Sequence, residues 1–221
     1  MSVWAVLVAA GRGERLGEDR PKAFVRLGEL PLLAEPLRRL DESGWIDAVV
    51  VVAPPDWEEP AILLAEEIGA SKVTACVTGG ETRSESVRAG VAEVPEDAAV
   101  ILVHDAARPL LPEAVIERVL GALSEGWDGV VPGLAVADTL KRLDADGSIG
   151  ETVDRDSLYA VQTPQAFPAD VLRRAVASDS DATDCAGLVE AAGGRVTVVE
   201  GDPQLLKVTT ADDLAKIASW L

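Results

Sequence analysis

Cysteine and histidine are scarce in this chain, and their scarcity excludes several kinds of site. The 221 residues include two cysteines, Cys76 and Cys185, and one histidine, His104. The two cysteines lack the paired spacing of a zinc site, and one histidine supports neither a zinc site nor a serine-hydrolase triad. We therefore expect no structural disulfide, and we assign His104 no role.

Basic residues are also few relative to acidic ones. The chain has 20 Lys and Arg against 38 Asp and Glu, which gives a formal net charge of −18. Such a charge argues against a nucleic-acid or membrane partner, so any phosphate site must concentrate its cations locally. Neither a signal peptide nor an apolar run of membrane length opens the chain, and a cytoplasmic protein is expected.

Short apolar runs alternate with amphipathic stretches along most of the chain. The runs that predict buried strands are 3–9, 46–53, 72–78, 99–103 and 129–134, and the expected helices are 31–40, 60–68, 83–94 and 112–123. This alternation predicts an α/β fold with a doubly wound, mostly parallel, Rossmann-like sheet in a single domain over residues 1–221. Because such sheets bind ligands beyond the carboxyl ends of their strands, the loops after Ala9, Thr78 and Val103 should meet at one edge.

The alternation stops after Pro132. Residues 139–143 and 149–153 flank Asp146-Gly147, a strong turn signal, so we predict a protruding β-arm over roughly residues 136–155. Helix and strand patterns then resume, with helices expected at 168–177 and 183–192, a strand at 196–200, and a last helix at 211–221 capped by Thr210.

A glycine-rich loop follows the first predicted strand. It runs from Ala9 to Gly17, contains Arg15, and leads to Pro21-Lys22. Glycines there let backbone N–H groups approach a phosphate, and the two cations would neutralise its charge. The spacing fits neither the dinucleotide fingerprint nor the P-loop. On this segment alone, phosphate binding and a simple turn remain equally open.

Three later segments carry candidate chemistry, and each also has a structural interpretation. The stretch 79–86 could bind a base or ribose, or form a glycine turn with Ser84 as a helix cap. Asp105 could bind Mg²⁺ or a ribose, or pair with Arg108. Lys207 could bind an anion, or face solvent on an edge strand.

The order of these motifs resembles one family from end to end. The glycine loop with Pro-Lys is followed by Gly-Gly-x-x-Arg-x-x-Ser-Val, His-Asp-Ala-Ala-Arg-Pro, Asp-Thr-Leu-Lys, Gln-Thr-Pro-Gln and Lys-Val-Thr. Each motif is weak alone, but the ordered set resembles the 2-C-methyl-D-erythritol 4-phosphate cytidylyltransferases over essentially all 221 residues. The resemblance implies a nucleotidyltransferase that transfers CMP from CTP to methylerythritol 4-phosphate with a divalent cation such as Mg²⁺.

The resemblance also implies residue roles and a partner. Arg15 and Lys22 would stabilise the transition state, Arg155 and Lys207 would position the acceptor phosphate, and Asp105 would be the metal ligand. The CTP contacts implied are Ala9, Ala10, Gly11, Gly13, Gly80, Ser86, Asp105 and Ala106, and the sugar-phosphate contacts are Arg108, Thr139 and Thr163. A homodimer through the β-arm would bring some of them from a second subunit.

Two alternatives stay open at this point. A related enzyme with the same loop transfers CMP to ribitol 5-phosphate, although Asp138-Thr139 and Thr163-Pro164-Gln165 as a set favour methylerythritol. A catalytically silent nucleotide-binding protein is the alternative from another class. The four cations Arg15, Lys22, Arg155 and Lys207 argue against it, because a binding module does not need charge at both the α-phosphate and an acceptor phosphate.

Overall fold

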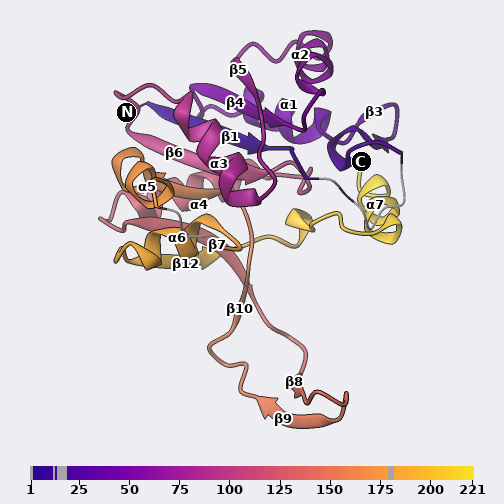
Figure 1. Ribbon diagram of the computed structural model, residues 1–221, viewed down its shortest axis with the longest axis vertical. Coiled ribbons are helices and arrows are strands. Elements are labelled where there is room, and N and C mark those ends of the chain that lie inside the picture. Colours follow the sequence, from indigo (N-terminus) through magenta and orange to yellow (C-terminus); the bar gives the residue numbers. More distant parts are fainter. Residues whose placement is uncertain (1, 12, 14–18, 179–181) are drawn as a thin grey trace.

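A mostly parallel β-sheet lies at the centre of the protein (Figure 1). The computed structural model describes residues 2–11, 13, 19–178 and 182–221. Within this part, eight strands follow the order β10-β7-β11-β6-β1-β4-β5, with β12 pairing with β7. Their bounds are β1 Val3–Val8, β4 Ala48–Ala53, β5 Val73–Thr78, β6 Val100–Asp105, β7 Gly129–Ala135, β10 Tyr159–Val161, β11 Gln165–Pro168 and β12 Val196–Glu200.

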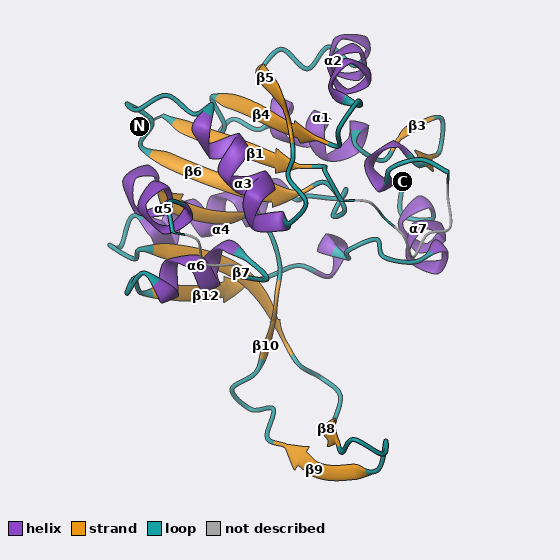
Figure 2. Ribbon diagram, in the orientation of Figure 1, coloured by secondary structure: helices purple, strands orange, loops and turns teal. Residues whose placement is uncertain are grey.

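Helices cover both faces of this sheet, as Figure 2 shows. Helices α1 (Ala34–Glu42), α2 (Glu58–Glu67) and α4 (Glu113–Leu123) pack on one face, and α3 (Arg83–Ala92), α5 (Ala169–Val176) and α6 (Cys185–Ala191) pack on the other. Every residue of β4 and β6 is buried, because helices cover both faces of these strands. The doubly wound α/β fold predicted from the alternation is confirmed.

Several short elements were not predicted. Strands β10 and β11 are antiparallel to their neighbours in the sheet. Before α1, β2 (Arg26–Leu27) pairs with β3 (Leu30–Pro31), and the 3-10 helix η2 spans Lys22–Phe24. The helix expected from Pro31 therefore begins at Ala34, because Pro31 belongs to the strand pair.

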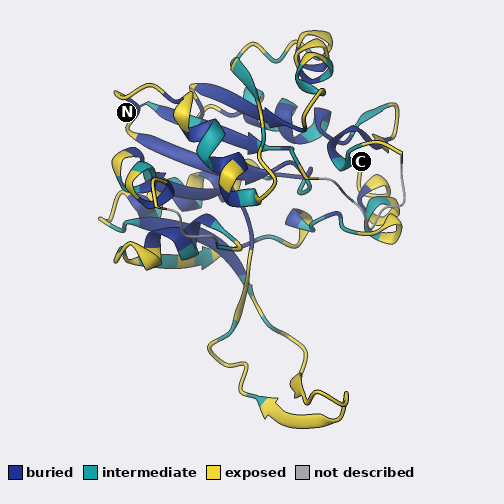
Figure 3. Ribbon diagram, viewed as in Figure 1, coloured by how far each residue is buried: buried dark blue, intermediate teal, exposed yellow. Residues whose placement is uncertain are grey.

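The region expected to form an arm contains an isolated hairpin. Strands β8 (Leu140–Leu143) and β9 (Ile149–Val153) pair only with each other among the described strands. Figure 1 shows them projecting from the body, and Figure 3 shows that the hairpin is almost entirely exposed. Gly147 has φ +84° at the tip, where the left-handed backbone favours glycine.

The C-terminal segment returns across the carboxyl edge of the sheet. After β12 come the 3-10 helix η3 (Pro203–Leu205), a stretch without regular structure, and helix α7 (Ala211–Ala218). Thr210 caps α7 as predicted, and Asp213 completes the capping box. A small cluster of Leu27, Leu32, Leu110, Val208 and Ile217 packs α7 and its approach against the body.

Helices of the described residues are all too short or too polar to span a bilayer.

Candidate functional site

A cleft of about 770 Å³ opens at the carboxyl ends of β1, β4, β5 and β6. Its lining confirms that the loops after the first, third and fourth predicted strands meet at one edge. The expected site residues found in the lining are Ala9, Ala10, Gly11, Lys22, Gly80, Ser86, Asp105, Ala106 and Lys207. Arg15, the other expected transition-state cation, lies outside the described residues.

The first loop places Lys22 at the cleft. Gly13 has φ +69°, and a Cβ built there would lie 2.7 Å from the Cβ of Lys22, so the loop backbone packs directly on this lysine. The ammonium group of Lys22 donates a hydrogen bond to the carbonyl of Val208 at 3.1 Å. This bond holds the side chain of Lys22 beside the segment that carries Lys207.

The second loop joins β5 to α3. Thr82, rather than Ser84, is the N-cap, and Glu85 completes a capping box with it. The hydroxyl of Ser86 accepts a bond from the backbone N–H of Gly80 at 3.1 Å and donates to the carbonyl of Thr82 at 3.0 Å. Ser86 therefore holds Gly80 in a fixed conformation against the cleft.

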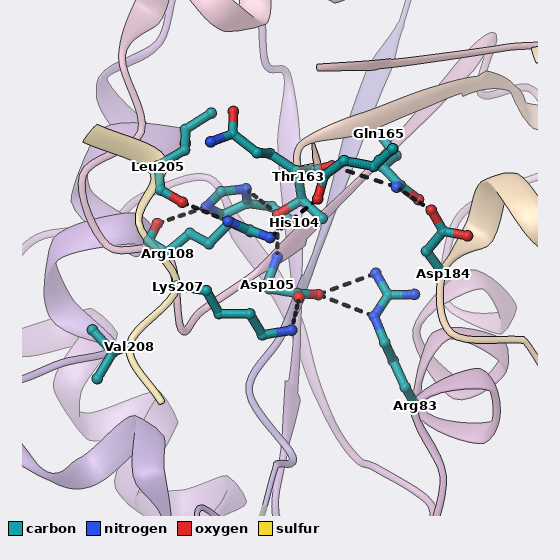
Figure 4. A network of polar contacts seen from close by, with 12 residues as sticks. Arg83, His104, Asp105, Arg108, Thr163, Gln165, Asp184, Leu205, Lys207 and Val208 are labelled. Carbon is teal, nitrogen blue, oxygen red and sulfur yellow. Dashed lines mark hydrogen bonds and ion pairs between the residues drawn. The ribbon is translucent and has the colours of Figure 1, made fainter. Parts of the chain in front are cut away.

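Asp105 ends β6 between two cations (Figure 4). Its Oδ1 lies 3.1 Å from both Nε and Nη2 of Arg83, and its Oδ2 lies 2.7 Å from Nζ of Lys207. Burial alone would raise the pKa of Asp105, but the charges of Arg83 and Lys207 outweigh it and hold that pKa well below its usual range. The carboxylate is therefore ionised. Its ion-pair partners are Arg83 and Lys207, and not Arg108 as the structural interpretation of the sequence expected.

Thr163 and His104 lie buried behind Asp105 (Figure 4). The carbonyl of Arg108 accepts from Nε2 of His104 at 3.0 Å, so Nδ1 must be the acceptor for the hydroxyl of Thr163 at 3.1 Å. The same hydroxyl accepts from the N–H of Asp105 at 3.0 Å. Burial lowers the pKa of His104 to about 4, so the ring is neutral and holds the 104–108 turn.

Arg108 also turns inward. Its Nη1 donates to the carbonyl of Leu205 at 2.6 Å, which ties the 104–108 turn to the C-terminal segment. Neither Arg108 nor Thr163 is among the described residues that line the cleft.

The two expected contacts near the arm lie outside the cleft of their own chain. Thr139 precedes β8, and Arg155 follows β9; both are exposed. Neither lines the cleft in the part of the chain that the structure describes.

Sequence reasoning missed several residues of the cleft lining, and two of them, Arg83 and Trp57, support the groups already described. Arg83 stands in the motif Gly-Gly-x-x-Arg-x-x-Ser, but its ion pair with Asp105 depends on the strand order of the sheet. Trp57 follows β4, lines the cleft, and contacts Phe24 with ring centroids 4.5 Å apart. Because Phe24 shares η2 with Lys22, this contact supports the turn that carries the lysine.

The acidic residues allow one kind of metal site. No group of three or more His, Cys, Asp or Glu side chains converges among the described residues. Asp105 lines the cleft, as do Asp19 and Glu81, and one carboxylate fits Mg²⁺ if the other ligands are phosphate oxygens and water.

Comparisons with known proteins agree over the full length. The family model for 2-C-methyl-D-erythritol 4-phosphate cytidylyltransferase matches residues 3–221. Proteins of that name from Nocardia farcinica and Saccharopolyspora erythraea are each 50% identical, covering 96% and 97% of this chain and 91% and 97% of their own lengths.

Solved structures give the same result. The cytidylyltransferase of that name from Thermus thermophilus superposes with a TM-score of 0.80 at 32% identity, covering 100% of this chain and 98% of its own. A 4-diphosphocytidyl-2C-methyl-D-erythritol synthase from Anaerococcus prevotii gives 0.85 at 26% identity, covering 99% and 95%. Because the family model matches residues 3–221 and curated relatives of that name are 50% identical over nearly the whole chain, the chain belongs to the 2-C-methyl-D-erythritol 4-phosphate cytidylyltransferase family.

Proposed function

We propose that the protein transfers CMP from CTP to 2-C-methyl-D-erythritol 4-phosphate, forming 4-diphosphocytidyl-2-C-methyl-D-erythritol and pyrophosphate. The observation that carries this proposal is that Lys22, Arg83 and Lys207 line one cleft, with the latter two paired to Asp105, in a chain whose net charge is −18. Concentrated cations in an acidic protein indicate an anionic substrate. The curated relatives named above carry the same activity in their names.

The reaction needs no nucleophile from the protein. An oxygen of the acceptor phosphate attacks the α-phosphorus of CTP and forms the new P–O bond. The bond from the α-phosphorus to the bridging oxygen breaks, and its electron pair leaves with pyrophosphate. The protein contributes by holding the two anions in line and by neutralising the charge that develops between them.

Lys22 and Lys207 would divide this work. Lys22, with Arg15 as the second expected cation, would stabilise charge at the α-phosphorus and on the leaving pyrophosphate. Lys207 would hold the acceptor phosphate. The hydrogen bond from Lys22 to the carbonyl of Val208 supports this division, because it fixes the lysine beside the segment that carries Lys207.

The CTP triphosphate and Asp105 would hold Mg²⁺ between them. When bound, the ion would neutralise phosphate oxygens and orient the triphosphate. The nucleoside would lie along the two glycine loops, against Ala10, Gly80 and Ser86. We expect the reaction to take place in the cytoplasm.

A pyrophosphate-release assay tests the proposal. The purified protein with CTP and Mg²⁺ should release pyrophosphate with methylerythritol 4-phosphate, and Lys22→Met should lower kcat by about 10²–10³ because one preorganised charge is lost. Lys216→Met is the control, since Lys216 lies on α7 over Trp220. Pyrophosphate release only with ribitol 5-phosphate would contradict methylerythritol 4-phosphate as the acceptor. Release with neither sugar phosphate would support a silent nucleotide-binding protein.

The active form would be a homodimer joined through the β8–β9 arms. A lone two-stranded hairpin is marginal in water, and Leu143 and Ile149 on this arm are 59% and 63% exposed. A second copy of the chain would cover them. In that dimer, Thr139 and Arg155 would reach the cleft of the partner subunit. This agrees with the finding that neither residue is among the described residues that line the cleft of its own subunit.

Mixed dimers test the arrangement. Co-expression of Lys22→Ala chains with Thr139→Ala chains yields mixed dimers with one doubly altered site and one intact site, if the arm acts in trans. At random mixing, about a quarter of all sites should be intact. Mixed dimers purified with two different tags should exceed the summed activity of the parent variants; activity no higher than that sum contradicts action in trans.

A further inference from the structure

The two cations on Asp105 are held in different ways (Figure 4). Arg83 meets Oδ1 through Nε and Nη2, both at 3.1 Å, and its side chain is 21% exposed. It is the first residue of α3, directly after the N-cap Thr82 and within the capping box that Thr82 forms with Glu85. The position of its backbone is therefore fixed by an ordered helix end.

The far side of the Arg83 guanidinium is also enclosed. Its Nη1 donates to Sγ of Cys185 at 3.5 Å. Gln165 fixes that cysteine, because its Oε1 accepts from the N–H of Cys185 at 3.0 Å and its Nε2 donates to Asp184 at 2.9 Å. Asp184 in turn caps α6. Arg83 thus has ordered partners on both sides and little freedom to leave Asp105.

The side chain of Lys207 has fewer contacts than that of Arg83. Among the described residues its Nζ makes one polar contact, 2.7 Å to Oδ2 of Asp105, and its side chain is 41% exposed. It lies between η3 and α7, in a stretch without regular structure, and it lines the cleft. A lysine on a flexible four-carbon stem can exchange one anion for another without moving the backbone.

We propose that Arg83 is the permanent partner of Asp105, whereas Lys207 rests on Asp105 until the acceptor phosphate competes for it and takes it over. This inference rests on the proposed function, because the competing anion is the acceptor phosphate. Lys207 can leave because Arg83 stays, so the buried carboxylate never loses its last counter-charge. Arg83 is then a positioning residue, and the Lys207 charge is directed to phosphate only when phosphate is bound.

Lysine NMR on the unaltered protein provides the first test. The chain contains five lysines, so ¹⁵N-labelled side-chain signals are few, and Lys207→Arg identifies the signal of Lys207. Methylerythritol 4-phosphate with a CTP analogue that carries an uncleavable α,β-methylene bridge, in metal-free buffer, should shift that signal. A Lys207 signal that stays in place at saturation overturns the proposal, and this test does not depend on any variant at Asp105.

A double-mutant cycle provides the second test. Asp105→Asn should strengthen binding of methylerythritol 4-phosphate by about 3- to 10-fold when Lys207 is present, a coupling expected for contacting charges. The gain should disappear in the Lys207→Met background. A gain of equal size in both backgrounds would reflect only the removal of a negative charge and would overturn the exchange.

Arg83→Gln tests the permanent partner. Without Arg83, Lys207 must stay with Asp105, so binding of the sugar phosphate should weaken more with Lys207 present than in the Lys207→Met background. Arg88→Gln is the matched control on α3, since Arg88 bonds to the carbonyls of Val176 and Ser178. A protein that binds neither CTP nor the sugar phosphate contradicts the proposed function itself. If the protein catalyses the reaction but the substitutions act additively in both double-mutant cycles, Asp105 with Lys207 and Arg83 with Lys207, then this inference is contradicted and the proposed function is not.

Discussion

Gly13→Ala should separate backbone strain from damage to the site. Gly13 has φ +69°, where an L-residue costs about 1–2 kcal/mol. The added Cβ would also lie 2.7 Å from Cβ and 3.2 Å from both Cα and N of Lys22. Because two of these atoms are backbone, the clash cannot be relieved by a side-chain rotation, and the Lys22 turn must move.

A displaced Lys22 should lower kcat/KM for CTP by about 10²-fold, which is the usual effect of a misplacement near 1 Å and corresponds to about 2.7 kcal/mol of transition-state stabilisation. The melting temperature should fall by about 2–8 °C, from 1–2 kcal/mol in a domain of this size. Steady-state kinetics and thermal unfolding measure the two effects on the same preparation.

Gly28→Ala is the matched control. Gly28 has φ +67° in the turn between β2 and β3, and its added Cβ would meet nothing within 4 Å. It should show a similar loss of melting temperature with unchanged kcat/KM. If both variants lose activity equally, or if Gly13→Ala retains full activity, then the contact between Gly13 and Lys22 does not position the lysine.

Three further predictions concern the acceptor site and the buried network. Arg155→Ala should raise KM for methylerythritol 4-phosphate and leave CTP binding by calorimetry nearly unchanged, because its guanidinium serves the other anion; equal loss of CTP affinity would contradict that role. Thr163→Val should lower the free energy of unfolding by about 2–5 kcal/mol, since the Asp105 N–H loses its acceptor and Nδ1 of His104 loses its donor. Thr163→Ser keeps the hydroxyl and should stay near the parent, and equal loss in both would contradict the hydrogen-bond argument. The unfolded chain binds a proton at His104 near pH 6.5 and the folded protein only near pH 4, so the free energy of unfolding should fall by about 3 kcal/mol as pH drops through that window. Denaturant titrations at several pH values measure this slope, and His104→Gln should reduce it; an unchanged slope in His104→Gln would contradict a neutral buried ring.

The parallel strands were predictable because their sequences carry the cause of their structure. Ala48–Ala53 is a continuous β-branched run between helices, and burial on both faces selects such residues. Strands Tyr159–Val161 and Gln165–Pro168 lack that signal, since both are short and prolines stand at positions 164 and 168. They pair because β6 and β7 provide neighbours, which is tertiary information.

The position of the cleft could be predicted from the sequence, but most contacts between its residues could not. Strand ends located Ala9, Gly80 and Asp105 correctly at one edge. The partner of Asp105 was not predictable, because Arg83 and Arg108 are both plausible along the chain. The sheet order decides between them: Arg83 points into the cleft, whereas Arg108 is drawn toward the carbonyl of Leu205.

The hydrogen bond between Lys22 and Val208 joins residues that lie 186 positions apart in the sequence. A growing chain can bury most of both sheet faces before Lys207 and Val208 have been added. The cluster that includes Leu27, Val208 and Ile217 then fastens the late segment to the early loop. Most of the sheet core is therefore synthesised before the lysine that completes the cleft, and a protease cut between β12 and Lys207 would leave a folded body with an incompletely assembled site.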